Sequence, residues 1–151
     1  MKTARRRARE FAVQGIYEWL LNPETPASLI EKHLRENDYF VKADEALFRN
    51  LLYTVIKDAA ELGPLVDRYH ERKAEEVSPV ERSVLLMAAM ELTQLPETPY
   101  PVIINEAIEI TKTFGGTDGH KFVNGVLDKL AADVRAEEVA RQKSRRQGAQ
   151  G

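Results

Sequence analysis

The chain has 151 residues, of which 43% are hydrophobic and 30% charged, as expected for a soluble globular domain with a single core. It contains no cysteine, which excludes disulfides, thiolate nucleophiles and thiolate zinc sites. Its longest apolar run, residues 84–90, is far shorter than the roughly 20 residues of a membrane span, and no signal peptide is recognisable. We therefore expect a cytoplasmic protein.

The formal net charge of −2 conceals an uneven distribution of charge. Residues 1–10 contain five cations and one acid, and residues 135–151 contain five cations and two acids. Residues 11–134 contain 12 Lys and Arg against 21 Asp and Glu. An acidic body repels a polyanion everywhere except at its basic ends, so any contact with a nucleic acid is expected to be local.

Apolar residues recur at helical spacing, and no segment shows the alternation that is typical of a strand. The first helix is expected over residues 3–21, where Asn22-Pro23 ends it, because a residue before proline is pushed out of the helical region. A second is expected over residues 25–37, with Pro26 at its first position.

A third helix is expected to begin near residue 43 or 44 and to carry a wide apolar face. Gly63-Pro64 is expected to break it, with a shorter helix continuing through Tyr69. Ser78-Pro79-Val80-Glu81 predicts the next start, because it combines a serine cap, a proline at the first position and a glutamate three residues after the cap. That helix, to about residue 94, is apolar on nearly all sides and should be buried.

Two more helices are expected over residues 101–114 and 118–134, hinged at Gly115-Gly116. Residues 135–151 are charged and poor in apolar side chains, which is typical of a disordered tail. The fold class predicted is therefore all-α, a compact bundle of about seven helices.

The arginine run at residues 5–7 opens a predicted helix, where the macrodipole disfavours each cation by about 0.3–1 kcal/mol. Together with the acidic body, this placement favours phosphate contact over a merely solvated terminus. Gln14 and Tyr17 extend the same helical face, although spacing alone favours an exposed amide and a half-buried tyrosine.

Residues 112–122 form a second candidate site, a glycine-rich turn before a helix N-terminus with lysines and aromatics on either side. Cations beside stacking surfaces are typical of single-stranded RNA recognition. From spacing alone, a plain helix–helix turn is favoured, with Asp118 as cap and Phe122 in the core.

Catalytic interpretations find no support. The three histidines lack metal-ligand spacing, and Glu106 and Glu109 with Lys112 are typical of an ion-paired surface. No nucleophile elbow, phosphate-binding loop or dinucleotide fingerprint is present. We expect no catalytic residue, no metal and no cofactor.

Several motifs resemble those of the NusB family. PVIINEAIEITKTFG at residues 101–115 and HKFVNGVLD at residues 120–128 resemble its C-terminal signature. RRRARE at residues 5–10, followed by Gln14 and Tyr17, resembles its N-terminus, and the resemblance covers about residues 2–134.

This resemblance implies a seven-helix fold of two small sub-bundles over residues 1–134. It implies transcription antitermination: binding of boxA RNA in ribosomal RNA operon leaders with NusE, a small-subunit ribosomal protein, in a complex with RNA polymerase. It implies neither cofactor nor catalysis.

The resemblance also assigns roles to single residues. The residues that it implies for RNA contact are Arg5, Arg6, Arg7, Gln14, Tyr17, Phe114, Asp118, Lys121 and Phe122. Glu81, on the exposed side of its helix, and Tyr100 in the following loop would face NusE. Gly119 stands where other members often carry a polar side chain, which removes one RNA contact, and residues 135–151 lie beyond the family core.

Two alternatives stay open. A NusB-like domain also precedes the catalytic domain of bacterial ribosomal RNA cytosine methyltransferases, but no such domain follows before Gly151. A purely protein-binding scaffold would use the Glu81 face. The sequence leaves the choice between monomer and homodimer open.

Overall fold

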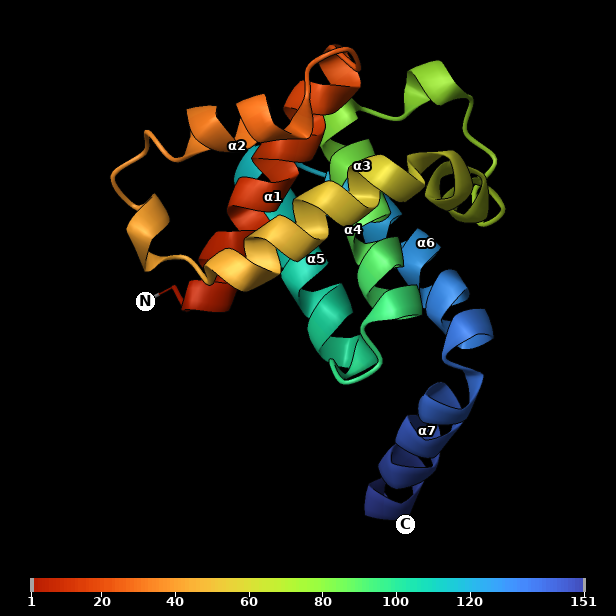
Figure 1. Ribbon diagram of the computed structural model, residues 1–151. Coiled ribbons are helices and arrows are strands. Elements are labelled where there is room, and N and C mark those ends of the chain that lie inside the picture. Colours follow the sequence, from red (N-terminus) through yellow and green to blue (C-terminus); the bar gives the residue numbers. More distant parts are fainter. Residues whose placement is uncertain (1, 151) are drawn as a thin grey trace.

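A computed structural model describes residues 2–150, which form seven α-helices and two short 3₁₀ helices and contain no strand (Figure 1). The helices are α1 (Ala4–Leu21), α2 (Ala27–Leu34), η1 (Phe40–Lys42), α3 (Glu45–Asp67), η2 (Ala74–Glu76), α4 (Pro79–Gln94), α5 (Tyr100–Phe114), α6 (Gly119–Val134) and α7 (Ala136–Gln150). Within this part of the chain, no helix combines the length and apolar character needed to span a bilayer.

Helix α4 is the centre of the fold. It packs against α1 and α3 on one side and against α5 and α6 on the other, so one core joins two groups of helices. Residues 83–90 of α4 are all buried, as their continuous apolar pattern predicts. The predicted all-α class is confirmed.

The start of α4 has the predicted cap. The Ser78 hydroxyl accepts a hydrogen bond from the Glu81 backbone N–H at 3.1 Å, and a Glu81 carboxylate oxygen accepts one from the Ser78 N–H at 3.0 Å. This reciprocal pair fixes the N-terminus of the central helix. Its position matters because the α5–α6 turn packs on it.

The predicted break at Gly63-Pro64 is wrong, because α3 continues through both residues to Asp67. Pro64 lies on the exposed side of the helix, where water can satisfy the carbonyl that loses its backbone donor. Gly63 has no Cβ to clash with the proline ring, which is the usual reason why a residue before proline leaves the helical region. Leu62 and Val66 are buried on either side and hold the segment in the core.

The segment 135–151, expected to be disordered, contains α7 instead, which extends away from the helical body (Figure 1). Its first turn is fastened by contacts that composition does not reveal. The Arg135 side chain is buried and donates to four backbone carbonyls around the end of α4, and Glu138 accepts from the Tyr100 N–H at 2.8 Å. Gly151 lies outside the described residues.

Gly15 marks the closest approach of α1 to its neighbours. A Cβ at this position would lie 2.8 Å from Leu52 Cδ1 and 3.2 Å from both Ile30 Cγ2 and Leu34 Cδ1. We expect Gly15→Ala to lower the free energy of unfolding by about 1–2 kcal/mol, because overpacking outweighs the gain in helix propensity. Denaturant unfolding measures the change, with Gly125→Ala as control, since a Cβ at 125 meets no atom within 4 Å. Equal stability of the two variants would contradict the expectation.

Candidate nucleic-acid interface

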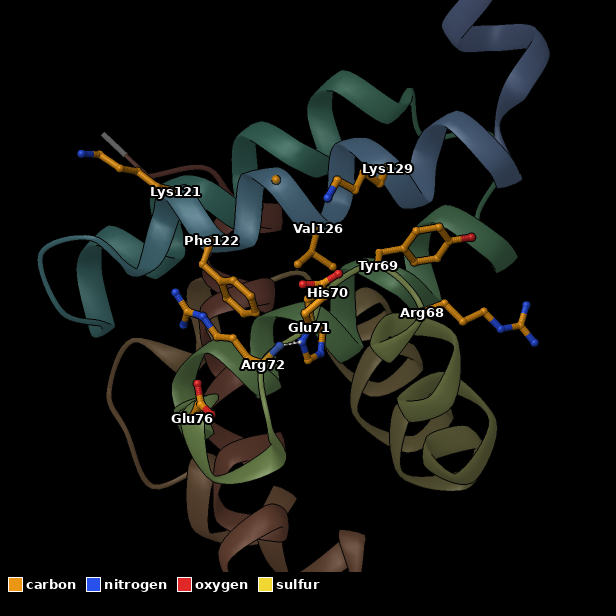
Figure 2. A pocket seen from close by; sticks show the side chains of 11 residues that line it. Arg68, Tyr69, His70, Glu71, Arg72, Glu76, Lys121, Phe122, Val126 and Lys129 are labelled. Atoms are coloured by element: carbon orange, nitrogen blue, oxygen red, sulfur yellow. Dashed lines mark hydrogen bonds between the residues drawn. The ribbon is translucent and has the colours of Figure 1, made fainter.

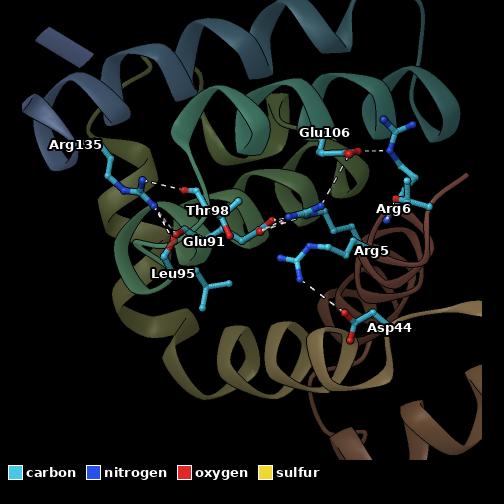
Figure 3. Close-up of polar contacts among 10 residues, drawn as sticks. Arg5, Arg6, Asp44, Glu91, Leu95, Thr98, Glu106 and Arg135 are labelled. Carbon is cyan, nitrogen blue, oxygen red and sulfur yellow. Dashed lines mark hydrogen bonds and ion pairs between the residues drawn. The ribbon is translucent and has the colours of Figure 1, made fainter. Parts of the chain in front are cut away.

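The arginine run at the start of α1 is divided among several partners. Thr3 caps the helix by accepting from the Arg6 N–H at 3.0 Å. The half-exposed Arg5 side chain lies 3.7 Å from an Asp44 carboxylate oxygen, and Arg6 pairs with Glu106 of α5 (Figure 3). Arg6 therefore fastens α1 to α5, whereas Arg5 has only a distant partner, whose other carboxylate oxygen caps α3.

Arg7 and Arg9 differ even more. The Arg7 guanidinium lies over the ring of Tyr39 at 5.3 Å from its centroid, and Lys42 lies over the same ring at 5.4 Å. Tyr39 is 56% exposed, so this cation–aromatic group faces solvent. Arg9, one of the five cations counted in the basic end, is 1% exposed and belongs to the core.

Two hollows run along α1 and meet at Phe114. One, of about 470 Å³, is lined by Arg7, Gln14, Tyr39 and Phe114 among others. The next, of about 690 Å³, is more apolar and includes Gln14, Tyr17 and Phe114. Of the residues that the family resemblance implies for RNA, the structure thus brings Arg7, Gln14, Tyr17 and Phe114 together on one face.

The α5–α6 turn holds this arrangement by packing on the start of α4. A Cβ at Gly115 would lie 3.7 Å from Val80, and one at Gly119 would lie 3.0 Å from a Glu81 carboxylate oxygen. A side chain at position 119 would therefore require Glu81 to move. The turn is close-packed here, and glycine permits the approach.

Beyond the turn lie the other residues predicted to bind RNA, Asp118, Lys121 and Phe122, which contact one another or Arg72 rather than α1. Asp118 precedes α6 but its side chain makes no cap hydrogen bond, so the cap expected from spacing is wrong. It pairs instead with Lys121 at 3.3 Å, and both side chains are largely exposed. Phe122 is half-buried rather than in the core, and the Arg72 guanidinium lies 3.8 Å from its ring centroid.

Sequence reasoning missed Arg72 and Tyr39. The only signal for Arg72 was the short basic stretch 68–73, which the acidic average of the body concealed. Tyr39 lies in a connection with no helical periodicity. Both positions depend on packing between segments far apart in the chain, which local sequence patterns do not indicate.

The two residues assigned to the NusE surface are less exposed than expected. Glu81 is 8% exposed, with one oxygen in the cap and the other 3.8 Å from Arg72. The exposed side expected along its helix is absent, because residues 83–92 of α4 are buried. Tyr100 is half-buried and is the first residue of α5 rather than part of a loop.

Comparison with known proteins decides the family. Residues 6–132 match the model of the NusB family. The chain belongs to the NusB family. The transcription antitermination protein NusB of Chromobacterium violaceum is 80% identical over 146 residues, which cover 97% of this chain and 98% of that protein.

Solved structures of the family share the fold. NusB of T. maritima matches with a TM-score of 0.77 and 30% identity, covering 93% of this chain and 99% of that one. A structure of the antitermination factors NusB and NusE in complex with dsRNA matches with a TM-score of 0.73 at 24% identity, covering 86% and 97%. The family resemblance and the helical fold that it implied are confirmed.

Proposed function

We propose that this protein is a transcription antitermination factor that binds boxA RNA in ribosomal RNA operon leaders together with NusE, so that RNA polymerase reads through terminators. The observation that carries the proposal is the relative of that name which matches 97% of this chain at 80% identity. The family is one of non-enzymatic RNA-binding factors, so the prediction that the chain is not an enzyme is confirmed.

The surface formed by Arg7, Gln14, Tyr17 and Phe114, here called the face along α1, supplies the physical basis for RNA binding. Arg5 and Arg7 provide positive charge for the backbone, and this contribution falls as salt rises. Tyr17 and Phe114 are 37% and 38% exposed and lie beside the Gln14 amide, so they offer stacking surfaces next to a hydrogen-bonding group. This combination suits unpaired bases, whose faces and edges are both accessible. Asp118, Lys121 and Phe122 extend the proposed site beyond the turn.

NusE is the proposed protein partner. Tyr100 and Glu81 are the proposed contacts, and Glu81 also holds the start of α4 through its cap hydrogen bond. NusE bound beside the RNA raises RNA affinity through reciprocal coupling of the two binding events. We further propose that the complex forms on RNA polymerase in the cytoplasm.

Replacing Arg6 and Arg7 together by alanine is expected to weaken binding of boxA-like RNA and to reduce the slope of log affinity against log salt. Each lost phosphate contact lowers that slope by about 0.7 for a single strand. Fluorescence anisotropy at several salt concentrations measures both quantities. Because Arg6 also pairs with Glu106, thermal unfolding must first show that the variant is folded at the assay temperature.

The matched control for this variant is Lys32→Ala with Lys57→Ala, which removes two exposed cations from α2 and α3 outside these hollows. It should retain the affinity and salt slope of the parent. Equal affinities and slopes for the Arg6/Arg7 variant and the parent would refute the proposed role of the arginine run.

A further inference from the structure

A basic groove lies between the end of α3 and α6, outside the face along α1 (Figure 2). Its volume is about 760 Å³. Four cations line it against two carboxylates, although the body as a whole is acidic. The cations are Arg68, Arg72, Lys121 and Lys129, and the carboxylates are Glu71 and Glu76. In Figure 2, Lys121 and Arg68 lie at opposite ends of the groove, with Arg72 and Lys129 between them.

In the middle of the groove, the side chains of Arg72, Phe122 and His70 pack against one another. The Arg72 guanidinium lies 3.8 Å from the centroid of the Phe122 ring, and the His70 ring meets Phe122 edge-on at 5.4 Å. His70 Nδ1 accepts a hydrogen bond from the Arg72 backbone N–H at 3.1 Å, and its Nε2 lies 2.8 Å from an Asp67 carboxylate oxygen. His70 is thus a positioning residue that holds both members of the stack.

Asp67 completes this support. Burial raises the pKa of Asp67, but the hydrogen bonds and charges of Arg82 and His70 outweigh that effect and hold the pKa below its usual value. The carboxylate therefore stays ionised and anchors His70 at neutral pH.

The rest of the groove is open and charged. Arg68 and Lys129 are exposed, and neither makes an ion pair within the described part of the chain. Gly125 also lines the groove, between Lys121 and Lys129 along α6, and a Cβ there would meet no atom within 4 Å, so no side chain fills this part of the groove.

The groove is also connected to the proposed RNA face. His70 and Arg72 line a neighbouring hollow that includes Leu21, and Leu21 in turn lines the hollow of Tyr17 and Phe114. The hollows that begin at Phe114 thus adjoin one another around the start of α4 as far as Arg72. A planar guanidinium over an aromatic ring, followed by spaced cations, matches the bases and phosphates of a single strand.

We propose that this groove holds a stretch of single-stranded RNA that flanks the segment bound along α1. A base stacks on the outer face of the Arg72 guanidinium, and Arg68 and Lys129 contact backbone phosphates. This inference rests on the proposed RNA-binding function and extends its footprint to three cations of the body to which sequence reasoning gave no role.

The test compares the parent with the double variant Arg68→Ala/Lys129→Ala. Each protein is titrated with a short boxA-like oligonucleotide and with the same oligonucleotide extended by a uridine run at its 5′ or its 3′ end. We expect one extended RNA to bind the parent several-fold more tightly than the short RNA. The double variant should lose this gain, with a salt slope lower by about 0.7 for each phosphate contact removed, and should bind the short RNA like the parent.

Arg72→Lys separates stacking from charge, because lysine keeps the cation but lacks the planar surface. It should lose part of the gain from the extension while keeping the salt slope. The charge-matched control for the Arg68→Ala/Lys129→Ala variant is again the Lys32→Ala/Lys57→Ala protein. The inference is overturned if neither extension strengthens binding to the parent, or if the double variant keeps the full gain. If the parent binds the short boxA-like RNA no more tightly than a scrambled RNA of the same length, the proposed function itself is refuted.

Discussion

Replacing Arg9 by methionine is expected to lower the free energy of unfolding by about 3–5 kcal/mol, because it leaves a buried carboxylate without a partner. Arg9 and Glu91 are each 1% exposed. Arg9 Nε donates to Glu91 Oε2 at 3.0 Å and Nη2 donates to Oε1 at 2.9 Å, a two-point pair between α1 and α4. Glu106, 4.0 Å from the same guanidinium, also loses a positive neighbour.

Removing both members of the pair distinguishes a lost attraction from an unpaired buried charge. Arg9→Met with Glu91→Leu should recover much of the stability lost in the single variant, because no charge then remains buried without a partner. Urea unfolding of the parent, both single variants and the double variant measures this. A single variant within about 1 kcal/mol of the parent, below the range for a broken buried pair, would contradict the structural role of Arg9.

Replacing Arg135 by alanine is expected to lower the free energy of unfolding by about 2–4 kcal/mol, because a charged donor to several buried acceptors is removed. Its guanidinium donates to the carbonyl oxygens of Leu92, Leu95 and Thr98 at 2.7–3.1 Å and to that of Glu91 at 3.2 Å (Figure 3). These carbonyls lie at and beyond the end of α4, where a helix leaves acceptors unpaired.

The same substitution should loosen α7. Arg135 also donates to Glu138 at 2.6 Å. Burial raises the pKa of Glu138, but the hydrogen bond from the Tyr100 backbone and the charge of Arg135 outweigh it and lower the pKa. Loss of Arg135 removes part of this fastening.

Circular dichroism and thermal unfolding measure both effects of Arg135→Ala, a drop in helicity and a drop in stability. Arg135→Lys should recover only part of the stability, because an ammonium cannot reach the same set of carbonyls with a flat fork. The exposed Arg145→Ala serves as control and should stay within about 0.5 kcal/mol of the parent. If Arg135→Ala is as stable as that control, the hydrogen bonds from Arg135 to the backbone carbonyls do not stabilise the end of α4.

Where the fold was predictable, local chemistry decided it. The cap at Ser78, the proline after Asn22 and the glycines after Phe114 each act within a few residues, and the corresponding helix ends lie close to the predicted positions. The third helix and α7 were mispredicted because packing overrode local preference. Pro64 faces solvent within a helix held by buried neighbours, and Arg135 reaches carbonyls about 40 positions earlier in the chain.

In the candidate site, too, local sequence predicted some features and packing between distant segments determined the others. Periodicity placed Gln14 and Tyr17 on one helical face, and the family resemblance added Phe114, which the structure brings beside them. Charge counting could not separate Arg9, which lies in the core, from Arg5 and Arg7, because burial is a property of the fold. The stack of Arg72 on Phe122 joins residues 50 positions apart, and no local pattern indicates it.

RNA binding in solution tests the proposed adaptor function most directly. Affinities for a boxA-like and a scrambled oligonucleotide are measured at two salt concentrations, with and without NusE. We expect a preference for the boxA-like RNA that increases when NusE is present, and affinities that fall with salt. Equal, weak binding to both RNAs that NusE leaves unchanged would contradict the proposed function and favour a helical scaffold that binds protein alone.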